Sequence, residues 1–110
     1  MTDLTTHLRD LVLPTPVLTA AGCAGPDLAT YVDLADVGAV VTRTVTPDPV
    51  AGAPAPRLVE TAAGLLSAVG DQNAGLAAFL ATELPWYARE QLRVVVSIAG
   101  DDLTGCRELA

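Results

Sequence analysis

The sequence predicts an α/β fold in which parallel strands are covered by helices. Runs of consecutive apolar residues, typical of strands buried on both faces, alternate with segments of helical periodicity. Strands that alternate with helices along a chain form a parallel sheet with the helices packed on it. The expected order is strand, helix, strand, long loop, helix, strand, helix.

The first strand and helix are expected in the N-terminal third. The apolar run Pro16–Ala21 predicts a buried strand that ends at Gly22. Gly25-Pro26-Asp27 predicts a helix start, because proline suits the first helical position and aspartate the positive end of the helix dipole. Gly38 is expected to end this helix. One apolar face is formed at helical spacing by Leu28, Tyr31, Val32 and Ala35.

The middle of the chain combines a second strand with a long connection. Ala39–Val45 predicts the strand, and the segment Pro54–Gly75 that follows is too rich in glycine and proline for a helix. It is also too apolar for a solvated linker. Ordering such a segment costs conformational entropy, so a long irregular loop inside a domain is usually functional.

The C-terminal part predicts the remaining helices and the third strand. Apolar residues repeat with helical period from Leu76 to Leu84, and Pro85 is expected to break or kink that helix before Trp86 and Tyr87 begin a short turn. Val94–Ile98 predicts the third strand. Asp101 or Asp102 is expected to cap the last helix.

These elements indicate the N-terminal part of a barrel. No strand follows the last helix, and three parallel strands leave exposed edges that proteins normally cover. A complete (β/α)8, or TIM, barrel needs about 250 residues, whereas the chain has 110. Hydrophobic residues make up 51% and charged residues 17%, which favours burial against further protein. Residues 1–110 are therefore expected to form one incomplete barrel domain.

Charge and composition exclude several classes of function. The net charge is −7 and all six basic side chains are arginines, so nucleic acid and anionic membranes are not expected partners. The chain lacks an apolar run of about 18 residues and a secretory pattern, which favours the cytoplasm. Cys23 and Cys106 have no metal-like spacing and are expected to be reduced thiols, and no metal site is predicted.

Several short motifs occur in a fixed order between Leu11 and Ala110. They are Pro16-Val17, Ala21-Gly22-Cys23-Ala24-Gly25, Leu34 to Gly38, Pro54-Ala55-Pro56-Arg57, Glu60-Thr61, Gly64 to Gly70, Gln72-Asn73, Glu83-Leu84-Pro85-Trp86 and Ile98-Ala99-Gly100. Together they resemble the N-terminal part of the class 1 dihydroorotate dehydrogenases, which are FMN-containing TIM-barrel enzymes of pyrimidine synthesis. The E-L-P-W and G-C pieces are more similar to the NAD-linked, heterotetrameric subclass.

The resemblance implies a site for FMN and orotate at the C-terminal ends of the strands. In that family dihydroorotate loses a hydride to the flavin and a proton to a cysteine, and an electron-transfer subunit or self-association accompanies the full-length enzymes. The family's cysteine lies beyond the end of this chain, so no catalytic residue is assigned and the isolated segment is expected to be inactive. The implied cofactor-binding residues are Ala21, Gly22, Arg43, Thr44 and Ser97. The implied substrate-binding residues are Arg43, Ser67, Ala68, Val69, Gly70 and Asp71.

The chain departs from the family pattern at these same positions. Arg43 replaces a lysine, which keeps the charge but adds a planar group that is never deprotonated. Ser67 and Ser97 replace asparagines and lose an amide's paired donor and acceptor. Asp71 replaces an apolar residue and places a negative charge where an anionic substrate binds. The alternative interpretation is a non-catalytic remnant of the barrel, or an interaction module that docks through its uncovered edges.

Structural roles are expected for four other residues with polar or ionisable side chains. Cys23 belongs to the loop after the first strand and has no base beside it in sequence. His7, the single histidine, is expected to be exposed. Arg57 and Glu60 are expected to pair across the long loop as anchors.

Overall fold

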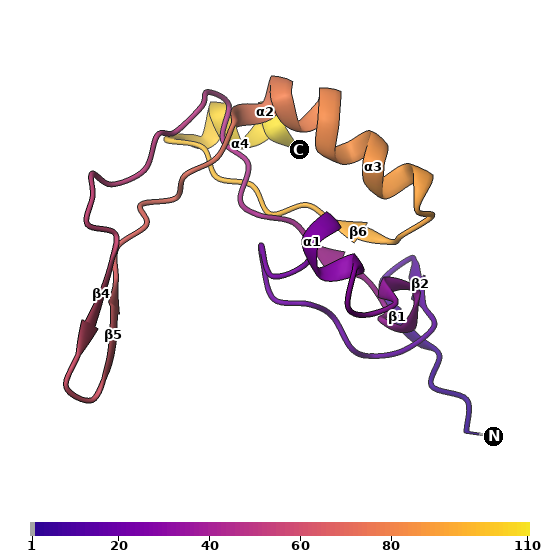
Figure 1. The fold of residues 1–110 in the computed structure, drawn as a ribbon. Coiled ribbons are helices and arrows are strands. Elements are labelled where there is room, and N and C mark those ends of the chain that lie inside the picture. The colour runs from indigo at the N-terminus through magenta and orange to yellow at the C-terminus, as the bar shows by residue number, and fades with distance from the viewer. Residues whose placement is uncertain (1) are drawn as a thin grey trace.

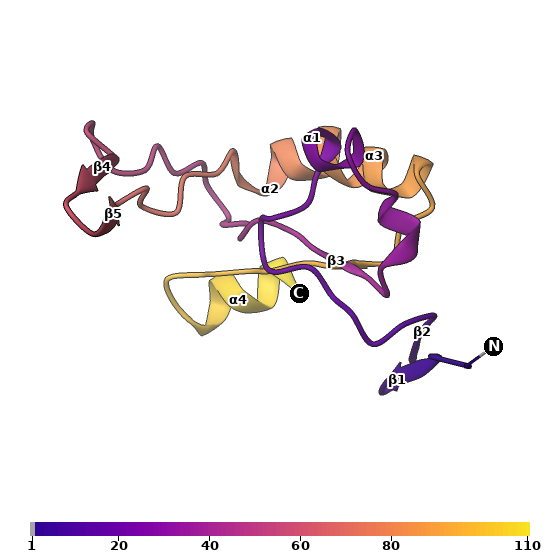
Figure 2. The same cartoon turned by 60° about the horizontal axis from the view of Figure 1, so that its bottom comes forward.

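Three extended segments run parallel to one another in the computed structural model, which describes residues 2–110 (Figures 1 and 2). Strand β3 (Val40–Val41) pairs in parallel with β6 (Val94–Val95), and a parallel bridge between Val45 and Ile98 continues this pairing. A parallel bridge between Leu18 and Ala39 adds the first segment on the other side. The order in space follows the order in sequence, which confirms an α/β fold with parallel strands.

The first of these segments differs from the buried strand predicted over Pro16–Ala21. It is held by hydrogen bonds from the Thr19 amide to the Ala39 carbonyl (3.3 Å) and from the Gly22 amide to the Val41 carbonyl (3.2 Å). Its side chains are not buried, since Val17 is 59% exposed and Leu18 is 41% exposed. The segment is an edge strand, and residues 2–110 do not cover these two side chains.

The first helix is shorter than the sequence predicted. Helix α1 (Pro26–Ala29) begins after Gly25, as expected, but lasts one turn, and a 3-10 turn, η1 (Leu34–Asp36), follows. The Asp33 side chain accepts a hydrogen bond from the Ala35 amide (2.9 Å) and so caps η1 instead of continuing α1. Tyr31, expected on the apolar face, is 85% exposed. Because α1 ends at Ala29, the prediction that this helix ends at Gly38 was wrong.

The second helical run is continuous through the predicted break. Helix α2 (Gly75–Ala78) passes through a π-helical segment, η2 (Phe79–Glu83), into α3 (Leu84–Arg89), and the run lies along one side of β3 in Figure 2. Proline lacks the amide that an α-helix would use, and the wider π turn that precedes Pro85 accommodates this loss. Of the predicted break or kink at Pro85, the break was wrong, because Trp86 and Tyr87 lie within α3 instead of beginning a new turn.

The predicted irregular segment Pro54–Gly75 contains a β-hairpin that projects from the rest of the molecule (Figure 1). Strands β4 (Leu58–Thr61) and β5 (Gly64–Ser67) pair antiparallel, and every residue in both strands is exposed. The prediction of an irregular loop was wrong here, because a hairpin exposed on both faces carries no alternating pattern. A second hairpin, β1 (Thr6–Leu8) with β2 (Leu11–Leu13), contains the exposed His7.

Arg57 anchors the base of the projecting hairpin, but not through Glu60. Its guanidinium donates to the backbone carbonyls of Ala53 (2.6 Å) and Ala51 (2.9 Å) and to the side-chain oxygen of Gln72. Glu60 lies farther along the hairpin, in β4, where it is paired with Leu65 of β5. The predicted ion pair was wrong, and carbonyl oxygens take its place.

The hydrophobic core is small for the length of the chain. It is one cluster formed by Ala24, Leu34, Val40, Val45, Phe79 and Tyr87. The accessible surface is 7902 Å², whereas a compact domain of 11.3 kDa exposes about 5,700 Å². The radius of gyration is 16.2 Å, against about 13 Å for a compact domain of 100 residues. Much of the apolar content therefore lies at the surface. Within residues 2–110, no helix has the length and apolar character needed to cross a bilayer.

Helix α4 (Leu103–Leu109) is capped by Asp102, which resolves the choice left open by the sequence. The Asp102 carboxylate accepts a hydrogen bond from the Gly105 amide (2.8 Å). Replacing Asp102 with alanine is expected to lower the free energy of unfolding by about 1 kcal/mol, because the cap is lost. Asp101→Ala is the matched control, with an expected change within about 0.5 kcal/mol. Urea denaturation measures both, and equal losses would contradict the cap.

Candidate functional site

The C-terminal ends of the three parallel segments meet at one edge of the sheet. Ala21 and Gly22 follow the first segment, Arg43 and Thr44 follow β3, and Ser97 lies near the end of the third. Gly22 has a φ of +71°, and a Cβ atom there would lie 3.4 Å from the Arg43 Cα. Glycine therefore lets the first loop turn closely against the end of the second strand.

A cavity of about 230 Å³ opens at this edge. It collects four of the five residues predicted to bind the cofactor and two from the predicted substrate loop. Its lining consists of Ala21, Gly22, Arg43, Thr44, Val69, Asp71 and Gln72. Segments far apart in the sequence thus come together where the site was expected.

Ser97 joins this site through Thr44. The two hydroxyl oxygens, Thr44 Oγ1 and Ser97 Oγ, lie 2.9 Å apart and share one hydrogen bond. Two hydroxyl groups have two hydrogens, so the second remains for another acceptor. The pair can therefore donate to a ligand and accept from it.

Three residues of the predicted substrate loop do not line the cavity. Ser67 belongs to β5 and pairs with Leu58. The Ala68 amide donates to the Arg57 carbonyl (2.8 Å). Gly70, with φ of +74°, packs so closely on the chain that a Cβ atom would lie 2.6 Å from the Ala53 nitrogen. These residues shape the loop, while Val69 and Asp71 reach the cavity.

The Arg43 guanidinium is the positive group of the site. It is exposed and donates one long hydrogen bond, 3.5 Å, to the Gln72 carbonyl. Within residues 2–110 it forms no ion pair, although the Asp71 side chain lines the same cavity. Most of its five N–H groups therefore remain for an anionic ligand.

Gln72 and Asn73 were predicted only as members of a motif, with no role of their own. Gln72 accepts hydrogen bonds from Arg57 through its side chain and from Arg43 through its carbonyl, and so links the base of the hairpin to the end of β3. Asn73 Oδ1 accepts from the Thr46 hydroxyl and from the Gly75 amide, both at 2.9 Å. Two adjacent amides after a Gly-Asp turn were the available signal.

A larger cavity of about 570 Å³ adjoins the site and shares Gly22 and Arg43 with it. Cys23 lines this cavity and is exposed, but it does not line the smaller one. The Tyr87 hydroxyl donates to the Ala24 carbonyl (3.3 Å) and fastens the loop to α3. Burial, assisted by the Glu83 carboxylate, raises the pKa of Tyr87, so this hydroxyl remains protonated.

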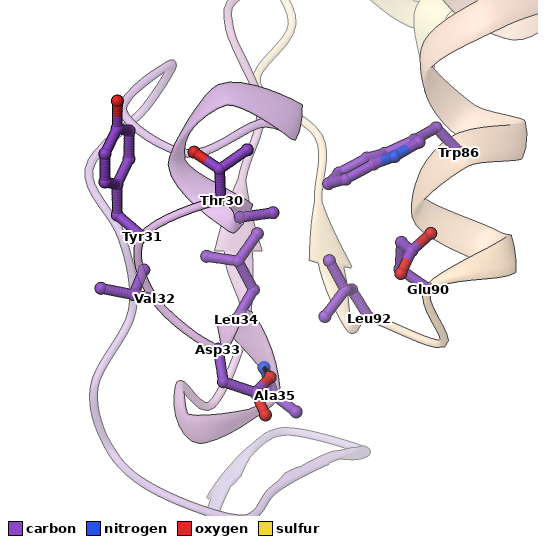
Figure 3. Close-up of a pocket in the computed structure, with 10 residues that line it drawn as sticks. Thr30, Tyr31, Val32, Asp33, Leu34, Ala35, Trp86, Glu90 and Leu92 are labelled. Carbon is purple, nitrogen blue, oxygen red and sulfur yellow. Dashed lines mark hydrogen bonds between the residues drawn. The ribbon is translucent and has the colours of Figure 1, made fainter.

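A third cavity, of about 410 Å³, lies between the Thr30–Ala35 segment and α3. Figure 3 shows Trp86, Glu90 and Leu92 facing that segment across it. None of the predicted site residues lines it. It is therefore separate from the edge where the strands end.

A family model described as dihydroorotate dehydrogenase matches residues 3–110. The chain belongs to the dihydroorotate dehydrogenase family. This confirms the resemblance found in the sequence motifs.

Curated relatives include several catalytic subunits of dihydroorotate dehydrogenase B (NAD(+)). The chain is 48% identical to that of Desulforudis audaxviator over 105 residues, which cover 94% of this chain and 34% of the relative. It is 42% identical to that of Pelobacter propionicus over 110 residues, which cover 98% of this chain and 36% of the relative. It is 39% identical to that of Listeria monocytogenes over 102 residues, which cover 91% of this chain and 34% of the relative. The chain thus spans about a third of the length of these relatives.

Proposed function

We propose that this chain forms the N-terminal part of a (β/α)8 barrel that oxidises dihydroorotate to orotate in pyrimidine biosynthesis, with FMN as hydride acceptor. The observation that carries this proposal is the convergence of Ala21–Gly22, Arg43–Thr44 and Ser97 at the ends of three neighbouring parallel segments. Active sites of such barrels lie at the C-terminal ends of the strands. Family membership supplies the reaction.

The residues at the strand ends fit a flavin. Ala21 and Gly22 carry little or no side chain, so a flat ring system can approach the backbone there. The hydroxyl pair of Thr44 and Ser97 offers a donor and acceptors to ring heteroatoms. When bound, FMN supplies the electron acceptor for the oxidation.

The cavity beside Arg43 fits an anionic substrate. Its guanidinium can form paired hydrogen bonds with the carboxylate of dihydroorotate or orotate and so orient the ring. Val69 adds an apolar contact, and the Asp71 carboxylate opposes the substrate's charge and weakens binding. We assign no proton acceptor to this chain, since Cys23 lines the neighbouring cavity instead.

The names of the relatives suggest a partner. They are catalytic subunits of an NAD(+) enzyme, so we propose that an electron-transfer subunit carries electrons from the flavin toward NAD. We place the reaction in the cytoplasm, where the substrate and NAD are available to it. The alternative partner is a second copy of the chain.

Anaerobic reduction of the bound flavin tests the proposed function. The protein is produced from its complete coding sequence and its flavin absorbance is recorded before and after addition of dihydroorotate. Loss of the oxidised flavin band with formation of orotate is expected. A folded protein that retains FMN but is not reduced by dihydroorotate, while dithionite reduces it, would overturn the proposal.

A non-catalytic interaction module is the second candidate function. The exposed surface of 7902 Å² and the projecting hairpin favour it, because exposed apolar surface and uncovered strand edges readily associate. It predicts that the 110-residue chain self-associates without binding flavin. A well-folded monomer, established by light scattering together with circular dichroism, would count against this candidate.

A further inference from the structure

The pairing of β3 with β6 contains an irregularity at the site. Val41 pairs with Val95, and the next pair is Val45 with Ile98. Three residues (42 to 44) lie between these pairs on the segment that continues β3, and two (96 and 97) on the segment that continues β6. The segment that continues β3 therefore carries one extra residue. An extra residue of this kind is a β-bulge, which bends a strand and re-aims its side chains.

The Thr42 side chain closes the gap that the bulge leaves. Its hydroxyl accepts a hydrogen bond from the Ser97 amide (3.1 Å) and donates to the Arg43 carbonyl (2.9 Å). Backbone hydrogen bonds continue on both sides, from the Thr42 amide to Val95 (3.0 Å) and from the Val45 amide to Ser97 (2.8 Å). Thr42 is fully buried, at 0% exposure, so solvent does not replace its hydroxyl.

The bulge explains how two adjacent residues face one cavity. In a regular strand, successive side chains point to opposite faces, so only one of Arg43 and Thr44 would reach the site. Both nevertheless line the 230 Å³ cavity. Ser97 contacts both sides of the bulge. Its hydroxyl oxygen lies 2.9 Å from the Thr44 hydroxyl oxygen, and its amide donates to the Thr42 hydroxyl.

We propose that Thr42 is a positioning residue whose hydroxyl holds this bulge and thereby brings Arg43 and Thr44 to the same cavity. The identity of the ligand in that cavity rests on the proposed function, whereas the bulge does not. Thr42 itself does not line the cavity, so its effect on binding passes through its two neighbours.

Two substitutions distinguish a hydrogen-bonding role of the Thr42 hydroxyl from a role of the side chain in packing alone. Thr42→Val keeps the branched shape and removes the hydrogen bonds, leaving the Ser97 amide without its partner. Thr42→Ser keeps the hydroxyl and removes a methyl group. A purely packing role predicts that the serine variant is the more damaged of the two.

Hydrogen exchange at the Ser97 amide and titration with orotate test the proposal in the protein made from its complete coding sequence. Thr42→Val is expected to lose about tenfold in exchange protection at Ser97 and about tenfold in orotate affinity, while Thr42→Ser stays within about threefold of the parent in both. Unchanged protection in Thr42→Val, or a tenfold loss in Thr42→Ser, would overturn it.

The two readouts also separate this proposal from the proposed function. If the parent does not bind orotate, the proposed function fails and the exchange measurement still decides the role of Thr42. If Thr42→Val does not fold, Thr42→Ser decides alone, because only a packing role predicts loss of Ser97 protection in that variant.

Discussion

Replacing Arg43 with glutamine is expected to weaken orotate binding by roughly ten- to a hundredfold. Hydrogen bonds to charged groups contribute about 1.5–3 kcal/mol, and about 1.4 kcal/mol corresponds to a factor of ten in affinity. Arg43 lines the cavity and forms no ion pair within residues 2–110, so its charge is available to the substrate. Isothermal titration calorimetry with orotate on the protein made from its complete coding sequence measures the change.

Arg93→Gln is the matched control for this experiment. Arg93 is also exposed, but it precedes β6 and so lies at the opposite end of the sheet from the cavity. Its replacement removes the same charge and is expected to change orotate affinity by less than about twofold, because exposed charges that far apart are screened. Equal effects of the two substitutions would show that Arg43 acts only through net charge.

Replacing Phe79 with alanine is expected to lower the free energy of unfolding by about 3–5 kcal/mol. Phe79 is 5% exposed and belongs to the core cluster with Val40 and Tyr87. Because few side chains form this core, the remaining ones cannot compensate for the cavity. Urea denaturation followed by circular dichroism measures the loss.

Leu80→Ala controls for helix propensity and hydrophobicity in the same experiment. Leu80 follows Phe79 in the same π-helical segment but is 51% exposed. Its replacement is expected to change stability by less than about 1 kcal/mol. A loss similar to that of Phe79→Ala would mean that the core is not centred where the structure places it.

The sequence predicted those strands, helix starts and caps that depend on residues close to one another along the chain. The apolar runs that became β3 and β6, the helix start at Gly25-Pro26 and the cap at Asp102 all depend on neighbouring residues. The length of α1 was not predictable from apolar spacing, because Asp33 caps a new turn instead. The helix through Pro85 was missed because a π turn, which sequence periodicity does not indicate, accommodates the proline.

Which predicted site residues line the cavity depends on where the strands end, and their roles in binding stay predictions. Ala21, Gly22, Arg43 and Thr44 lie together because parallel strands end at one edge. The positions of Ser67 and Ala68 depend on the pairing of β5 with β4, which the sequence did not reveal. The role of Thr42 depends on a bond to Ser97, 55 positions away, so a single polar residue in an apolar run gave no indication of it.

A crystal structure of the protein with FMN and orotate would show whether the cofactor and substrate bind at the ends of the parallel strands. We expect the flavin ring against the backbone of Ala21 and Gly22, with the orotate carboxylate within hydrogen-bonding distance of the Arg43 guanidinium. Flavin bound away from these strand ends, for example between the Thr30–Ala35 segment and Trp86 with Arg43 pointing into solvent, would contradict it.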